Sequence, residues 1–158
     1  MRCVVFAGLI MAALAGTPLS GYGQSSSDGA VIRQSDAFPF TDLDAWVAAS
    51  KGSAEFNEAA FRKSHSREEV ARFVREVECL RVGYRSGDLT IEGFILKPRA
   101  LKTGEKRPVI IYNRGGNQFL AIIDQEKLYS LRKFVLAGYV VVASQYRGGG
   151  GSEGQDEF

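Results

Sequence analysis

Two glycine-rich segments are the places in this sequence where a backbone could approach a bound molecule most closely. The first is Asn113-Arg114-Gly115-Gly116-Asn117, and the second runs from Gln145 to Gly154 and contains four consecutive glycines. Each follows a run of apolar residues, Val109–Tyr112 and Tyr139–Ala143. If these runs are neighbouring strands of a parallel sheet, both segments lie outside the carboxyl ends of the strands, where open α/β sheets bind ligands.

The second segment also matches the letters of the dinucleotide-binding pattern G-x-G-x-x-G, at Gly149, Gly151 and Gly154. That pattern requires its third glycine to lie in a helix packed against the preceding strand, with an acidic residue about 20 residues later. No apolar helix pattern follows here, and four consecutive glycines satisfy many patterns by chance. We therefore expect no nucleotide cofactor.

The elements that would position these segments begin with a helical leader over residues 38–77. Apolar residues such as Leu43 and Trp46 recur at the spacing of one helix face. Ser66 and Glu69 form a capping box, in which the Ser66 hydroxyl accepts a hydrogen bond from the Glu69 amide and the Glu69 carboxylate reaches back. The sequence therefore predicts that a helix of the leader begins at this point.

A β-hairpin is predicted over residues 80–98, because apolar residues alternate on both sides of a turn at Ser86-Gly87-Asp88. The two later apolar runs are continuous, as is typical of parallel strands covered on both faces. Between them, the sequence predicts one helix with an apolar stripe formed by Leu128, Leu131, Phe134 and Val135, capped by Gly138.

The strand, helix and strand after the hairpin should form a right-handed βαβ unit. The predicted fold class is therefore α/β, with a helical leader, a β-hairpin and one βαβ unit. We find no internal repeat.

From Leu80 to Phe158 the sequence resembles the beginning of the catalytic domain in the prolyl oligopeptidase and acylaminoacyl-peptidase branch of the α/β-hydrolases. Three ordered phrases carry the resemblance: Gly93-Phe94 through Pro98, the pair Gly115-Gly116, and Gly138-Tyr139 through Tyr146-Arg147-Gly148 to Gly151. The resemblance covers about half of the chain, and the helical leader adds nothing to it. It implies a serine hydrolase that acts through an acyl-enzyme, on a peptide or an ester.

The resemblance also makes Arg114, Gly115 and Gly116 candidates for the oxyanion hole. Attack of serine on an acyl carbonyl places negative charge on oxygen, and one donor to that oxygen commonly comes from the loop after the third strand. Relatives usually carry Tyr or His where this sequence has Arg114. Arg114 could bind the oxyanion, bind an acidic group of the substrate, or be a surface residue. The glycine pair could also be a tight turn without a ligand role.

The nucleophile, acid and base of that family are not expected among these residues. Ser152 satisfies the letters G-x-S-x-G, but it lies several glycines beyond its strand, whereas the nucleophile elbow joins a strand directly to a helix. His65, the only histidine, precedes every expected sheet strand, and the family places its histidine last. The sequence therefore predicts that residues 78–158 are the N-terminal half of an α/β-hydrolase domain, truncated before the triad and inactive alone.

The N-terminus predicts export. Arg2 precedes an apolar run from Val4 to Ala15, which is typical of a signal peptide over residues 1–23 and too short to span a membrane. Cleavage after Gly23 fits best, and Ala13-Leu14-Ala15 offers an earlier site; a buried helix or membrane anchor is the alternative. Residues 24–37, rich in Ser, Gly, Asp and Gln, should form a flexible lead-in.

Composition argues against other classes. Loss of residues 1–23 lowers the net charge from +2 to +1, which gives no reason to expect a nucleic acid or membrane partner. Cys79 would be the only cysteine left, so neither an internal disulfide nor a metal site is expected. The remaining alternative to a hydrolase is a noncatalytic secreted binding protein with a hydrolase-like fold.

Overall fold

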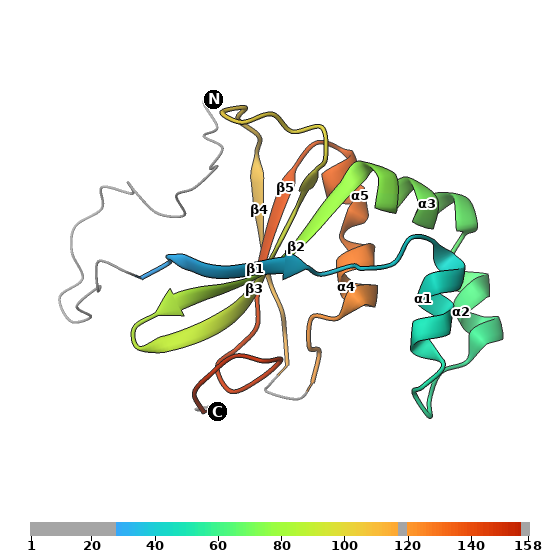
Figure 1. The fold of residues 1–158 in the computed structure, drawn as a ribbon, viewed down its shortest axis with the longest axis horizontal. Helices are drawn as coiled ribbons and strands as arrows, with labels where there is room; N and C mark the ends of the chain where they lie inside the picture. Colours follow the sequence, from blue (N-terminus) through green and yellow to red (C-terminus); the bar gives the residue numbers. More distant parts are fainter. Residues whose placement is uncertain (1–27, 117–119, 156–158) are drawn as a thin grey trace.

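The computed structural model describes residues 28–116 and 120–155. The expected signal peptide and the start of the lead-in lie outside the described residues. Figure 1 shows the elements in chain order, which are β1 (Val31–Asp36), α1 (Leu43–Ser50), α2 (Glu58–Ser64), α3 (Arg67–Glu76), β2 (Val77–Ser86), β3 (Leu89–Pro98), β4 (Val109–Asn113), α4 (Gln125–Ser130), α5 (Arg132–Leu136) and β5 (Val140–Ser144).

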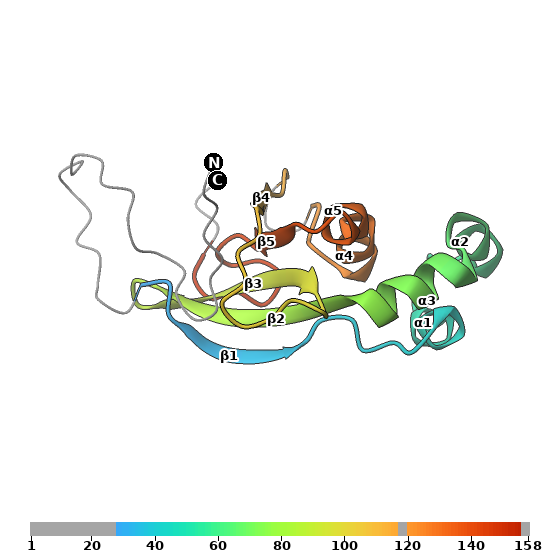
Figure 2. The same ribbon diagram turned by 90° about the horizontal axis from the view of Figure 1, so that it is seen from above.

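The strands form one mixed sheet in the order β1-β2-β3-β5-β4. β1, β2, β3 and β5 pair antiparallel with their neighbours, and β4 pairs parallel to β5. The chain therefore leaves β4 at the edge, crosses over through α4 and α5, and returns to form β5 between β4 and β3. Figure 2 shows this order, with α4 and α5 beside β5. The predicted α/β class is confirmed, as are the hairpin and the strand–helix–strand unit.

The hairpin forms because side chains alternate along both strands and because the turn between the strands contains Gly87, which can adopt a positive φ. Ser86 pairs with Leu89, so the loop has two residues, and Gly87 has φ +60°. A positive φ at the first central residue is the requirement of a type II′ turn. Beyond the turn the two strands remain paired in register as far as Val77 and Pro98.

The prediction of a flexible lead-in is wrong for residues 31–36, which form β1 along the edge of β2. All six side chains of this strand are exposed, so it shows no apolar alternation in the sequence. Its register shifts between Val31 and Arg33, which marks a β-bulge. Pairing with β2 creates the strand, and the lead-in sequence does not reveal it.

The helical leader is confirmed as three short helices, each beginning at a side-chain cap. Asp42 accepts from the Ala45 amide, Asn57 from the Ala60 amide, and Ser66 from the Glu69 amide at 3.4 Å. The second half of the predicted capping box is wrong, because the Glu69 carboxylate pairs with Arg132 Nη2 at 3.2 Å. Val77 begins β2, so α3 leads directly into the sheet, as Figure 1 shows.

The leader shares its core with the strands. Trp46 packs edge-on against Phe38, Phe61 and Tyr129, with ring centroids 4.8 to 5.4 Å apart. Tyr129 belongs to α4, so the aromatic cluster joins the leader to the crossover segment. Phe94, Leu96 and Val141 from the central strands belong to the same apolar cluster. Leader and sheet therefore form one packed unit.

Two expectations about the strand–helix–strand unit are wrong. The single predicted helix is divided at Leu131 into α4 and α5, and Phe134 is exposed and does not join the buried stripe. β4 is covered on one face only: Ile110 and Tyr112 pack against the core, whereas Val109 and Ile111 are 45% and 73% exposed. The continuous apolar run of β4 therefore leaves an open apolar face at this edge of the described sheet.

Candidate functional site

The two glycine-rich segments lie side by side, because the parallel strands β4 and β5 end at the same edge of the sheet. Asn113 and Ser144, the last residues of these strands, are paired in register. The Tyr146 hydroxyl, just after β5, donates a hydrogen bond to the carbonyl oxygen of Arg114, just after β4. The two loops are therefore in contact outside the carboxyl ends of the strands, where the sequence predicts the crevice.

The buried side chain of Arg114 connects the two loops. Its residue is only 2% exposed, its guanidinium carbon lies 4.1 Å from the centroid of the Tyr146 ring, and its Nη1 donates to the Leu120 carbonyl at 2.7 Å. Stacking of a cation on an aromatic face is strongest when both are removed from water. The interpretation of Arg114 as a surface residue is therefore wrong. We call Arg114, Tyr146 and the Leu120 carbonyl the loop clamp.

The two glycines of the pair differ in whether their backbone position requires glycine. Gly116 has φ +86°, and a Cβ atom there would lie 2.5 Å from the Leu120 carbonyl oxygen. Gly115 has neither constraint, because a Cβ there would meet no atom within 4 Å. Both residues are exposed, and within residues 28–116 and 120–155 no acceptor takes a hydrogen bond from either amide. These amides are therefore accessible donors at the carboxyl end of β4.

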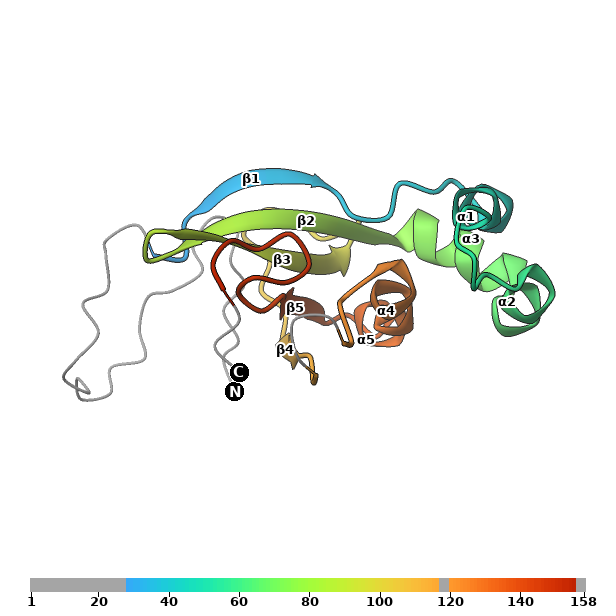
Figure 3. The ribbon, with the colours of Figure 1, turned by 90° about the horizontal axis from the view of Figure 1, so that it is seen from below.

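The second glycine-rich segment folds back on β3. Ser152 Oγ accepts from the Glu92 amide at 3.0 Å, and the Glu153 carboxylate accepts from the Thr90 amide at 2.6 Å. The latter bond holds the pKa of Glu153 below its usual value. Figure 3 shows this dark red loop lying beside β3. Ser152 thus has a structural partner on β3.

His65 lies in the leader and not at the loops. It follows the last residue of α2, its Nδ1 is 2.9 Å from the Phe61 carbonyl oxygen, and its ring stacks on Phe61 at 4.1 Å. The ring also contacts Trp46 and Tyr129 in the aromatic cluster. These contacts give His65 a packing role in the leader.

Two buried polar side chains near the loops were not predicted. Gln145 is 3% exposed and bonds both the amide and the carbonyl of Ile123, at 3.3 and 3.0 Å, so it holds the segment after the first loop. Glu92 is 2% exposed and forms an ion pair with Arg33 of β1. Arg81 Nε lies 3.7 Å from its other oxygen. Glu92 therefore joins β1 to β3, the strand on which the second loop folds back.

The described residues give no sign of a metal site or a membrane span. Within residues 28–116 and 120–155, no three His, Cys, Asp or Glu residues are grouped so that they could hold a metal ion. None of the helices in these ranges has the length and apolar character to cross a bilayer.

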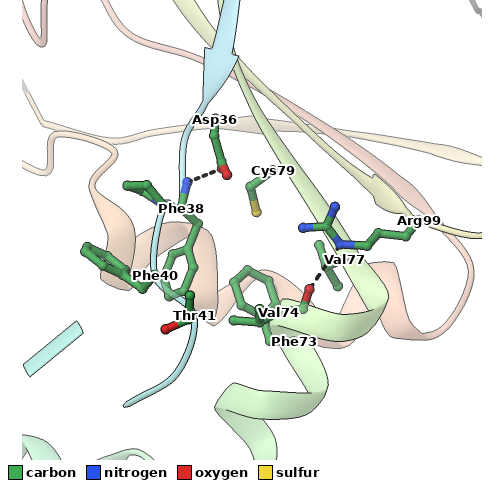
Figure 4. Close-up of a pocket in the computed structure, with 10 residues that line it drawn as sticks. Asp36, Phe38, Phe40, Thr41, Phe73, Val74, Val77, Cys79 and Arg99 are labelled. Carbon is green, nitrogen blue, oxygen red and sulfur yellow. Dashed lines mark hydrogen bonds between the residues drawn. The ribbon is translucent and has the colours of Figure 1, made fainter. Parts of the chain in front are cut away.

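A separate pocket of about 270 Å³ lies where the segment after β1 crosses α3 and the start of β2. Figure 4 shows Cys79 in this pocket, with Asp36 on one side and Arg99 on the other. Burial, with a smaller contribution from the Asp36 charge, raises the pKa of the Cys79 thiol from 9.0 to about 12. The thiol is therefore protonated at neutral pH and is a weak nucleophile.

We expect Cys79 to make stability depend on alkaline pH. Above pH 9 the unfolded thiol ionises while the folded thiol stays protonated, so stability present at pH 8 is lost as pH rises toward 12. Urea unfolding at pH 8 and pH 10 should show that the wild type loses about 1 kcal/mol more than Cys79→Ala between the two values. Equal losses in both proteins, or rapid reaction of the native thiol with a disulfide reagent at pH 8, would contradict this assignment.

The comparisons with known proteins identify no family for this chain, so its function has to be inferred from its own residues. No protein-family model matches the sequence, and no curated protein is detectably similar to it. The class of function therefore depends on the loop geometry described above and on the ordered phrases of the sequence.

Proposed function

We propose that this chain is the N-terminal part of an exported serine hydrolase with an α/β-hydrolase sheet, cleaving a peptide or an ester through an acyl-enzyme. The observation that carries the proposal is the pair of accessible amides at Gly115 and Gly116, held at the carboxyl end of β4 by the loop clamp. Donors that are fixed before the reaction stabilise a developing oxyanion without a cost of reorganisation. In this proposal the two amides form one side of the oxyanion hole.

Arg114 is the positioning residue of this hole. Its Nη1 is engaged with the Leu120 carbonyl, and its side chain is enclosed between the two loops. The guanidinium therefore contributes mainly by fixing where Gly115 and Gly116 lie.

The arrangement of the sheet is consistent with the proposal. An antiparallel hairpin precedes the parallel pair, and the later strand β5 lies inside the earlier strand β4. The exposed apolar side chains of Val109 and Ile111 are expected to be covered in a functional hydrolase by further strands and helices, since a half-covered parallel pair is costly in water. The nucleophile, acid and base would belong to that remaining part of the domain.

Fluorophosphonate labelling tests the proposal. The protein captured from its source by an antibody against this chain should be labelled on one serine and should hydrolyse nitrophenyl esters. The 158-residue chain alone should not be labelled, because among the described residues no base is hydrogen-bonded to Ser152 Oγ, which accepts from the Glu92 amide.

The matched control is Ser152→Ala in the 158-residue chain, which should behave as the unmodified chain does. Absence of label on the captured protein would refute the hydrolase and favour the noncatalytic binding protein. An adduct on Ser152 itself would show instead that the nucleophile has been placed wrongly.

A further inference from the structure

A basic groove runs between α3 and α5, away from the two loops. It consists of two adjoining hollows of about 500 and 610 Å³, which meet at Leu136. The α3 side of the groove carries Glu69 and Glu76. The basic residues of the groove come from both helices and from the two ends of the connection between β3 and β4. These basic residues are Arg72, Arg75, Arg99, Arg107, Arg132 and Lys133.

Positive charge is concentrated in this groove. Six basic and two acidic side chains line it, a net of +4, whereas the whole chain has a net charge of only +2. The rest of the molecule is therefore slightly acidic. An anionic partner would be directed to this groove in preference to other surfaces.

The ion pairs along the groove leave its cations available. Arg72 and Arg75 share one carboxylate, that of Glu76, at 3.1 and 3.0 Å, and all three side chains are substantially exposed. Arg132 bridges the two helices to Glu69 at 3.2 Å, and Arg107 pairs with Glu105 at 2.5 Å, with both of these side chains partly exposed. Exposed pairs of this kind contribute little to stability, so an incoming carboxylate can replace them at small cost.

The shape and the lining residues of the groove favour an acidic peptide over a single-stranded nucleic acid. Leu136 and Pro98 supply apolar surface between the cations, and among the described residues no aromatic side chain lines either hollow. Single-stranded nucleic acids bind on aromatic stacking platforms, which this groove lacks. An extended peptide, by contrast, places every second side chain on one face, so that a row of acidic residues can face the arginines of the groove.

We propose that the basic groove between α3 and α5 binds an extended acidic peptide segment of a partner protein. The guanidinium of Arg132 is already held 3.9 Å from the centroid of the Tyr129 ring, so part of the groove is organised before the peptide arrives. This inference does not depend on the proposed hydrolase activity, because none of the groove residues belongs to the loop clamp or to the glycine pair.

Fluorescence anisotropy of a labelled eight-residue peptide with alternating glutamate and leucine tests the inference on the full chain. The peptide should bind and should weaken with added salt, whereas a lysine–leucine peptide should not bind. The double variant Arg75→Gln with Lys133→Gln removes one cation from each hollow and should weaken binding about tenfold. The control Lys63→Gln with Arg85→Gln removes the same charge elsewhere and should change binding less than about twofold.

Three outcomes would overturn the inference. These are no peptide binding by the wild type, equal binding by the groove variant and its control, and stronger binding of oligo-dT or of phosphatidylglycerol vesicles than of the peptide. The last result would assign the groove to a nucleic acid or to a membrane surface. Circular dichroism of each variant establishes that the fold is retained, so that a loss of binding reports on the groove.

Discussion

Replacing Gly116 with alanine is expected to lower the free energy of unfolding by about 3 kcal/mol, whereas the same change at Gly115 should have almost no effect. At Gly116 the backbone has φ +86°, which L-residues adopt only with strain, and the new methyl group would lie 2.5 Å from a backbone oxygen. Backbone cannot move aside as the end of a flexible side chain can. At Gly115 the added methyl group meets open space.

The two glycine variants form a matched pair, because they differ by one position and make the same chemical change. Urea unfolding of both, measured against the wild type, gives the difference directly. In the proposed hydrolase, Gly116→Ala should also reduce the turnover number, since displacing the loop moves both amides. Similar stabilities for the two variants would show that the loop does not have the backbone conformation described here.

The second large effect is expected at the loop clamp. Arg114→Met should destabilise the protein by about 3 kcal/mol, because it removes a charged hydrogen bond to the Leu120 carbonyl and the cation over the Tyr146 ring. Arg114→Lys should recover only part of this loss, since an ammonium group cannot stack flat on the ring and bond the carbonyl at the same time. Tyr146→Phe should cost about 1 kcal/mol through loss of its bond to the Arg114 carbonyl.

A double-mutant cycle of Arg114→Met and Tyr146→Leu separates the clamp from simple burial. If the two side chains act together, the double variant should lose measurably less stability than the two single variants combined. Strict additivity would show that they stabilise the loops independently. In the proposed hydrolase, a positioning role for Arg114 predicts a fall in both the turnover number and the specificity constant with all substrates. A change confined to the Michaelis constant for acidic substrates would assign Arg114 to substrate binding instead.

Local patterns were sufficient to predict most of the sheet. The hairpin follows from alternation around a glycine turn, and β4 and β5 follow from continuous apolar runs, because these signals depend on residues only one or two positions apart. β1 was missed because all of its side chains are exposed and its only partner, β2, lies about 50 residues away. A strand of this kind is defined by pairing and not by burial.

The candidate site was predicted in its location but not in its internal contacts. The positions of the two loops follow from the parallel strands that precede them. The burial of Arg114 depends on Tyr146, which is 32 residues further along the chain, and that of Glu92 depends on Arg33, 59 residues earlier. Polar residues that are buried by distant partners show no local signal in a single sequence, so neither of these two roles could be predicted.

The two edges of the sheet differ in how readily a further strand could pair with them. β1 ends it with a bulge and with side chains that include Arg33 and Asp36, features that discourage a further strand from adding. β4 ends it with a short, regular, apolar strand that has no such protection. Any strand that extends this sheet, from the same chain or from another, should therefore add beside β4, on the side of the molecule where the Gly115–Gly116 loop begins.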